Sequence, residues 1–394
     1  MNRSVYKLNK NIPEGTRDLI FDEADLYSDI IDKFKKIFVR SGFKQIITPS
    51  IEYYDVFDYH GQSISQEEMY KLTDNNGRLI VLRADNTTPA ARVFAAKLKN
   101  TKYPQKLYYN QNVYRINNGY SGKRNEIMQS GVEIIGEGGL KNDLISITTA
   151  IDVFRSLGIK YKIEIGHVGY FNALIKEYDF DEEDIKLIRS YVNAKNAVSL
   201  DVMNKLESCE RIRRIPLLFG GAEIFDEVEN LAGDNKAALR ALEYVKKIFF
   251  LLTDAGYGEN IMVDMGIVHQ IDYYTGVVFG GYLEGIGEPV LKGGRYDNLI
   301  RNFDCCIPAT GFAVNVCSVA DVLKKHKSRL IGTDKYIIHY DVENLAAAEK
   351  FKNSHENCEY SCFDDYETTV KYAEDNNIKF VVLITENGAE VKEI

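Results

Sequence analysis

The chain has 394 residues, a formal net charge of −9 at pH 7, 45% hydrophobic residues and 27% charged residues. This length suits two to three domains with a sizeable core, and the composition is ordinary for a globular protein. Because it shows no run of 18 apolar residues and no apolar segment near its N-terminus, we expect no membrane span and no secretion signal, and therefore a cytoplasmic protein. The acidic balance argues against a large nucleic-acid surface, although it is compatible with a local basic groove.

The six cysteines are scattered along the chain, at positions 209, 305, 306, 317, 358 and 362. They form no C-x-x-C pair, and the six histidines do not cluster near them. Spacing of this kind is not that of a zinc site, so we expect reduced thiols and no bound metal.

The N-terminal part predicts a turn, a helix and a strand. The turn-forming segment Pro13–Asp18 precedes a helix that runs from about Asp22, a suitable N-cap, to Arg40, and Ser41-Gly42 ends it. The following segment, Phe43–Pro49, predicts a strand closed by proline. Any helix and strand can end in this way, so the pair alone does not indicate a role.

A second short strand, predicted to begin at Leu79, leads into a group of polar residues. Strand alternation places Arg83, Asp85 and Thr87 on one side, and a helix follows directly. Asn86 and Thr87 are equally suited to contact a ligand and to cap that helix.

A β-hairpin is predicted from Leu107 to Gly136. Its first strand alternates polar and apolar residues and ends at Arg115, and residues 117–123 have the Gly, Asn and Ser content of a loop. The second strand carries Gln129 and Glu133 four residues apart and therefore on one face. That face, together with Arg115, could hold a small zwitterion, and a plain surface hairpin is the alternative.

Two β-rich stretches later in the chain, Asp264–Phe279 and Lys292–Leu299, contain the Tyr273-Tyr274 pair and a double glycine before Tyr296. Adjacent tyrosines on a strand point to opposite faces, so one can line a pocket while the other packs, or both can belong to the core. The double glycine would allow a backbone to approach a ligand closely.

The remaining segments predict an alternation of helices and strands. A helical region about 169–256 includes the basic run Glu210–Arg214, which could touch RNA or form a solvated helix face. The last segment, 330–394, predicts a small acidic α/β domain. The other elements are expected at 143–157 (helix), 161–166 (strand), 335–340 (strand), 346–352 (helix), 367–375 (helix) and 379–384 (strand).

These segments together resemble the class II aminoacyl-tRNA synthetases, most closely the histidyl-tRNA synthetases. The resemblance covers roughly residues 8 to 325 and implies an α+β fold, with an antiparallel sheet flanked by helices and a helical insertion, over a core domain 1–325. The helix and strand that end at Pro49 are similar to motif 1, which implies self-association as a dimer. The other matching stretches are 107–136 (motif 2), 264–279 (the histidyl signature) and 292–299 (G-G-R-Y-D-x-L).

The resemblance also implies a site for L-histidine. Asp85 and Thr87 correspond to residues that contact the amino group, and Tyr274 to the residue that faces the imidazole. Asp85 is shorter than the glutamate of the family, so its contact with an ammonium group would be placed differently. The complete implied set is Asp85, Thr87, Arg115, Gln129, Glu133, Tyr274 and Tyr296.

The residues of the family pattern that handle the nucleotide are altered in this sequence. Arg115 keeps the motif 2 arginine, but Asn117 and His269 replace a glutamate and an arginine, and Cys317-Ser318 replaces the glutamate and arginine of motif 3. Each lost electrostatic donor typically costs about 2.7–4 kcal/mol of transition-state stabilisation. We therefore assign no catalytic residue and no cofactor, and expect no aminoacylation.

A chain that combines an amino-acid site, altered nucleotide-binding residues and a short C-terminal domain resembles the regulatory subunits of ATP phosphoribosyltransferase, the first enzyme of histidine biosynthesis. This resemblance implies a subunit without activity of its own that assembles with and activates a short catalytic subunit. It also implies the relay of feedback inhibition by L-histidine, and it makes tRNA an unlikely partner. The alternatives are an active histidyl-tRNA synthetase and an RNA-binding or uncharged-tRNA-sensing module.

Overall fold

The computed structural model describes residues 10–59, 64–117, 123–206, 209–268, 273–326 and 335–394. The chain divides into two compact units, Met1–His326 and Lys327–Ile394, which are described separately below. None of the helices in these ranges is both long and apolar enough to cross a bilayer.

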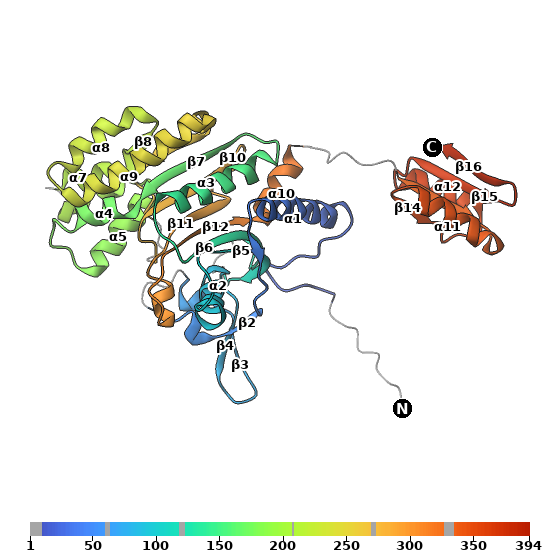
Figure 1. The fold of residues 1–394 in the computed structure, drawn as a ribbon, viewed down its shortest axis with the longest axis horizontal. Helices are drawn as coiled ribbons and strands as arrows, with labels where there is room; N and C mark the ends of the chain where they lie inside the picture. Colours follow the sequence, from blue (N-terminus) through green and yellow to red (C-terminus); the bar gives the residue numbers. More distant parts are fainter. Residues whose placement is uncertain (1–9, 60–63, 118–122, 207–208, 269–272, 327–334) are drawn as a thin grey trace. The chain divides into compact units, whose positions relative to one another are not determined.

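A nine-stranded, mainly antiparallel sheet forms the centre of the first unit (Figure 1). Two of its pairs are parallel, β1 with β5 and β7 with β9. The α+β architecture expected from the sequence is thus confirmed. In spatial order the strands are β1 (Lys44–Gln45), β5 (Gln105–Tyr114), β6 (Glu126–Ile135), β12 (Ala309–Asn315), β11 (Leu291–Arg295), β10 (Val277–Leu283), β7 (Tyr161–His167), β9 (Ile261–Asp264) and β8 (Phe219–Gly220).

One face of this sheet is covered by α1 (Asp22–Arg40) and α3 (Leu140–Arg155), with α10 (Val316–Lys325) beside α1 (Figure 1). The buried ring of Phe38 on α1 packs against Tyr108 and Phe312, at centroid distances of 5.6 and 6.2 Å. Aromatic side chains of β5 and β12 therefore anchor α1 to this side.

The ends of α1 agree with the sequence at one terminus and differ at the other. Gly42, with φ of +82°, directly follows the C-cap residue Ser41. At the other end the N-cap is Phe21, and Asp22 is the first helical residue, so the prediction of Asp22 as N-cap was wrong. Acidic residues in the first turn stabilise the helix through its dipole without occupying the cap position.

The opposite face of the sheet, which we call the Glu133 face, is built from a ladder of small residues. Glu133, Gly311 and Gly294 are cross-strand partners on β6, β12 and β11. A Cβ atom on Gly311 would lie 2.0 Å from the Glu133 carboxylate, and one on Gly294 would lie 2.8 Å from the Tyr274 ring. The double glycine therefore admits side chains of the protein itself, with Gly293 receiving the ring of Phe279 from the helix-covered side.

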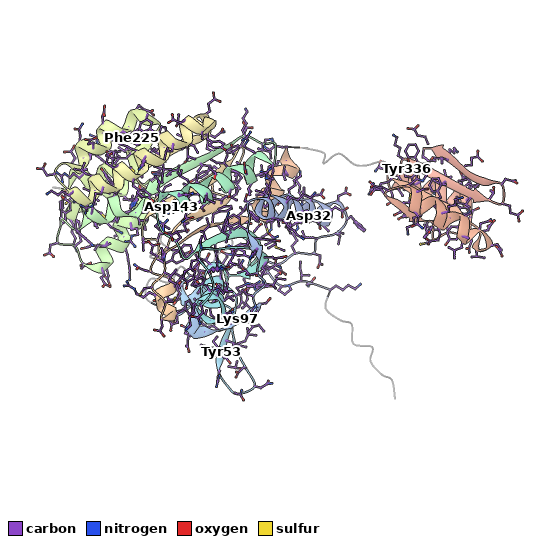
Figure 2. All side chains as sticks on the ribbon, in the orientation of Figure 1. Asp32, Tyr53, Lys97, Asp143, Phe225 and Tyr336 are labelled. Carbon is purple, nitrogen blue, oxygen red and sulfur yellow. The ribbon has the colours of Figure 1, made fainter. Side chains whose placement is uncertain are left out.

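A three-stranded sheet, β2 (Ile51–Tyr53), β4 (Leu79–Leu82) and β3 (Lys71–Thr73), precedes α2 (Thr87–Val93), which a π-helical turn extends to Leu98. Figure 2 shows Tyr53 at this small sheet. The predicted strand at 43–49 is regular only in β1, and the strand beginning at Leu79 is half exposed, because only Val81 faces the core. Short 3₁₀ turns lie at Tyr54–Val56 and Gln66–Glu68.

The helical insertion is confirmed. Its basic run forms helix α7, whose arginines make ion pairs with acids of the insertion: Arg211 with Glu177, Arg213 with Asp201, and Arg214 with Glu227. This pairing favours the solvated-face interpretation over RNA contact. The helices are α4 (Val168–Ile175), α5 (Glu182–Asn193), α6 (Ala197–Asp201), α7 (Glu210–Arg214), α8 (Phe225–Ala232) and α9 (Lys236–Leu252).

A buried ion pair between α3 and the sheet also receives a hydrogen bond from the insertion. Arg295 on β11 donates through Nε and Nη2 to both carboxylate oxygens of Asp143 on α3, at 3.1 and 2.8 Å. The hydroxyl of Tyr244 on α9 donates to the same carboxylate at 2.6 Å. Figure 2 shows Asp143 in the core and Phe225 within the insertion.

The second unit is a four-stranded sheet in the order β14 (Cys358–Tyr360), β13 (Tyr336–Tyr340), β15 (Phe380–Thr385) and β16 (Gly388–Glu393). Helices α11 (Leu345–Ser354) and α12 (Tyr366–Asp375) cover opposite faces, α11 against Ile338 and α12 against Ile337. The sequence did not predict β14 or β16. Every residue of β16 is exposed, so it carries little of the apolar alternation that identifies a strand.

Candidate ligand-binding site

The candidate site is centred on Glu133, which lies within β6 and is only 1% exposed. One carboxylate oxygen accepts hydrogen bonds from the hydroxyls of Thr87, at 2.9 Å, and Tyr109, at 3.1 Å. The other oxygen accepts from the hydroxyl of Tyr296. Three neutral donors from α2, β5 and the end of β11 thus converge on one buried carboxyl group.

This environment raises the pKa of Glu133 to about 8, because burial disfavours the charged form. The hydrogen bonds from Tyr296, Thr87 and Tyr109 oppose that effect, and the nearby charge of Asp85 adds to it. No lysine or arginine makes an ion pair with Glu133 in the part of the chain that the structure describes. A buried carboxyl group without a cation is well suited to a ligand that brings a positive charge.

Aromatic rings surround this carboxyl group. The ring centroids of Tyr273 and Tyr274 lie 4.9 Å apart, and those of Tyr273 and Tyr296 lie 5.8 Å apart. The prediction that Tyr273 and Tyr274 point to opposite faces of a strand was wrong, because both residues precede β10 and the alternation of a strand does not apply to them. Both rings belong to one buried cluster, and burial followed by the charge of Glu133 raises the pKa of Tyr274.

The polar residues before α2 divide between capping the helix and forming the site. Asp85 accepts from the backbone N–H of Thr88 at 2.7 Å and from its hydroxyl at 3.1 Å, so it caps the first turn. Thr87 reaches Glu133, and Asn86 donates to Gln129 at 3.1 Å. Asp85 therefore fills the capping role left open for Asn86 or Thr87. Asp85 also lies near Tyr59: burial raises the pKa of Tyr59 most, and the charge of Asp85 raises it further.

Asn86 was considered from the sequence only as a ligand contact or a cap. Its amide nitrogen donates to the side chain of Gln129 and to the carbonyl of Gln111, whereas its buried Oδ1 has no hydrogen-bond partner within the described ranges. Buried polar atoms are normally paired, so this acceptor is suited to a donor on a ligand, such as an ammonium group.

The structure thus brings Thr87, Gln129, Glu133, Tyr274 and Tyr296 together, with Asp85 at the margin. Tyr109, which also donates a hydrogen bond to Glu133, was not predicted. The two residues are far apart in the sequence, and only the pairing of β5 with β6 brings them together.

Arg115 is placed differently from this cluster. Its Nε donates to the carbonyl of Ala84 at 2.8 Å, and its side chain lines a polar cleft with a volume of about 1100 Å³. The cleft wall holds equal numbers of cationic and acidic side chains: Arg17, Arg115, Lys123 and Arg124 against Glu14, Glu68, Glu288 and Asp321.

Two of the cleft cations are neutralised by strong ion pairs. Arg124 donates through both terminal nitrogens to the two oxygens of Asp321, each at 2.9 Å, and Arg17 pairs with Glu23. The sequence analysis did not identify Arg124, because its partner is 197 residues away on α10. A bidentate arginine–carboxylate pair leaves little of the positive charge for a phosphate group.

The altered motif residues have structural roles. Cys317 accepts a hydrogen bond from the Met128 backbone at 3.4 Å, and the N–H of Ser318 is capped by Asn315 at 3.1 Å. Asn117 donates to the carbonyl of Arg124 at 2.7 Å. His269 lies outside the described residues. Within those residues, no group of three or more His, Cys, Asp or Glu side chains is arranged to hold a metal ion.

Comparison with known proteins gives consistent results. A family model described as histidyl-tRNA synthetase matches residues 15–319. A protein of Clostridium botulinum (strain Langeland) named ATP phosphoribosyltransferase regulatory subunit is 43% identical over 387 residues, covering 95% of this chain and 92% of that protein. A protein of the same name from Clostridium acetobutylicum is 40% identical and covers 95% of each chain.

Solved structures show the same relationship. The structure titled as an ATP phosphoribosyltransferase regulatory subunit/histidyl-tRNA synthetase from Bacillus halodurans C is 30% identical, with a TM-score of 0.82 over 93% of this chain and 97% of that chain. Histidyl-tRNA synthetase from Nostoc sp. PCC 7120 has a TM-score of 0.78 at 19% identity, covering 98% of this chain and 95% of that one, and shows the shared fold.

Proposed function

The chain belongs to the family of ATP phosphoribosyltransferase regulatory subunits, which has the histidyl-tRNA synthetase fold, and from this premise we propose that it is a non-catalytic regulatory subunit of that enzyme in histidine biosynthesis. It assembles in the cytoplasm with a short catalytic subunit, activates it, and relays feedback inhibition by L-histidine. The observation that carries this proposal is the buried Glu133 cluster, which is retained beside a polar cleft of balanced charge.

The Glu133 cluster fits the chemical groups of histidine. Glu133 and the ring of Tyr274 offer an acceptor and an aromatic surface to the imidazole, and the orphan Oδ1 of Asn86 next to Gln129 offers an acceptor to the ammonium group. Arg115, at the cleft wall, is the candidate cation for the carboxylate. Binding to one assembled state more tightly than to another would then shift the activity of the partner, with coupling of about 1–3 kcal/mol sufficient for regulation.

The cleft supports the absence of autonomous catalysis. Formation of an aminoacyl-adenylate, in which a carboxylate attacks the α-phosphate of ATP and pyrophosphate leaves, requires fixed cations around the phosphates, because electrostatic stabilisation is the principal contribution that a protein makes to such a step. Here Arg124 and Arg17 are bound to carboxylates, and four acidic side chains share the cleft wall. A triphosphate would therefore find little net positive charge in this cleft.

The decisive experiment reconstitutes the chain with a short ATP phosphoribosyltransferase catalytic subunit. We expect co-elution in one hetero-oligomer, a rise in phosphoribosyltransferase activity over the catalytic subunit alone, and inhibition by L-histidine that disappears in Glu133→Ala. Activity that is independent of this chain would refute the proposal. Robust exchange of radiolabelled pyrophosphate into ATP with histidine would instead support a synthetase, and retention of tRNA at low salt would support an RNA-sensing module.

We also propose that the chain forms a dimer through the motif 1 region and the adjoining three-stranded sheet. The side chains of Ile51 and Tyr53 on β2 and Leu72 on β3 are about half exposed on one face, and Ile47, four residues before β2, is 78% exposed. An apolar set of this kind is typical of a protein–protein contact. Tyr53→Asp should yield monomers in light scattering after gel filtration, whereas Leu217→Asp, at an exposed position of the insertion, should leave the dimer intact.

A further inference from the structure

Lys292 is a cation that none of the motifs singled out. It lies on β11, two residues before Gly294, and pairs across the sheet with Ala313, which in turn pairs with Gly131. Since side chains alternate along a strand, Lys292 belongs to the Glu133 face, one step along the strands from the row of Glu133, Gly311 and Gly294. Its direct neighbours in this row, Ala313 and Gly280, are small, and the row continues to Tyr109 beyond Gly131 and to Glu164 beyond Gly280.

The positive charge of Arg115, which lines the cleft, acts on Lys292. Burial lowers the pKa of Lys292, and the positive charge of Arg115 lowers it further, while Glu288 opposes both effects. The Lys292 side chain nonetheless remains accessible to solvent. Among the described residues, neither Lys292 nor Arg115 makes an ion pair, and Glu288 is itself 3.9 Å from Lys123.

We propose that Lys292 and Arg115 together bind the carboxylate of the amino acid whose cationic side chain lies at Glu133. This inference rests on the proposed function and adds to it Lys292, as a residue that recognises the carboxylate of the amino acid. Two residues along a strand span about 6–7 Å, so the rows of Glu133 and Lys292 are separated by a distance that an extended amino acid bridges. The two cations repel each other, and an anion between them removes this repulsion.

The charge of the surroundings favours a single carboxylate over a phosphate-rich ligand. The cleft that Arg115 lines presents Glu14, Glu68, Glu288 and Asp321. A group with one negative charge can be neutralised by Lys292 and Arg115, whereas a polyphosphate would extend toward these acids.

Calorimetry at pH 7.5 with L-histidine and with histamine, which lacks the carboxylate, tests this assignment in the full chain. Lys292→Met keeps the aliphatic length and removes the charge. We expect the dissociation constant for histidine to rise about tenfold or more, in line with the loss of a charge-assisted hydrogen bond. Histamine affinity should stay within about twofold of the wild type, which also shows that the variant is folded.

Lys123→Met, which removes an exposed cation of the same cleft, should change histidine affinity less than about twofold. Unchanged histidine affinity in Lys292→Met, or an equal loss for histidine and histamine, would overturn the role of Lys292 and leave the proposed function intact. Binding of inorganic phosphate that depends on Lys292 while histidine binding does not would also overturn it. A wild-type chain that binds neither histidine nor histamine would overturn the histidine site of the proposed function as well.

Discussion

Replacing Glu133 with glutamine should change the stability of the ligand-free protein in a pH-dependent way. The pKa of this carboxyl group rises from 4.5 in the unfolded chain to about 8 in the folded protein, chiefly because of burial. Between these values the folded state holds a proton that the unfolded chain has released, so a rise in pH favours unfolding. The stabilising contribution is therefore complete below about pH 4.5 and is lost as the pH approaches 8.

The size of the effect follows from linkage. Each pH unit inside this interval removes about 1.4 kcal/mol of folding free energy. Because Glu133→Gln cannot titrate, its unfolding free energy relative to the wild type should increase by on the order of 3 kcal/mol between pH 5 and pH 8. Urea unfolding of both proteins, followed by circular dichroism at several pH values, measures this difference.

Two further observations make the test specific. Tyr296→Phe removes a hydroxyl that stabilises the Glu133 carboxylate, so the loss of stability should extend to higher pH than in the wild type. Histidine affinity of Glu133→Gln should fall by roughly 10- to 100-fold, the range for a hydrogen bond to a charged group. Parallel pH profiles for wild type and Glu133→Gln would refute the reasoning, because they would show that burial of this carboxyl group does not shift its titration.

Two further substitutions test the scaffold that holds the site. Asp143→Ala should lower the unfolding free energy by about 3–5 kcal/mol in urea titration, since it leaves the buried Arg295 without its bidentate partner. As a control, Arg40→Ala breaks an exposed ion pair and should lower the unfolding free energy by less than about 1 kcal/mol. Equal losses in the two variants would contradict the assignment. Gly311→Ala should abolish histidine binding in calorimetry, because its methyl group would lie 2.0 Å from the Glu133 carboxylate; wild-type affinity in this variant would contradict the position of Glu133.

Local sequence patterns predicted helices and strands well where the hydrophobic period and the residues that end an element agree. The helix ending at Arg40, the hairpin of β5 and β6, and the helical insertion were all found at the expected places, because each combines a clear hydrophobic period with Gly, Asn or Ser at its ends. The strand expected at 43–49 is shorter than predicted, with only Lys44–Gln45 paired in the sheet, and the orientation of Tyr273 and Tyr274 was misjudged because strand alternation was assumed outside a regular strand.

The sequence also contained the chemical groups of the candidate site, but not how each one is used. Asp85 and Thr87 were both expected to contact an amino group, which remains a prediction; in the structure Asp85 caps α2 and Thr87 donates to Glu133. Asn86, considered a contact or a cap, holds the orphan acceptor. A difference of one or two residues changes the direction of a side chain at a strand-to-helix junction, and sequence spacing does not specify that direction.

What the sequence by itself determined is the order of helices and strands and most of the residues of the Glu133 site, because these depend on residue identity and on neighbours a few positions apart. Only the tertiary structure decided the long-range partners: Tyr296 with Glu133, 163 residues apart, and Arg124 with Asp321, 197 residues apart. Such contacts follow from the order of strands in the sheet, which places distant segments side by side and lets their side chains neutralise or orient one another. The physical reason is that hydrogen bonds and charges act over a few ångströms of space, whereas local sequence patterns report only the distance along the chain.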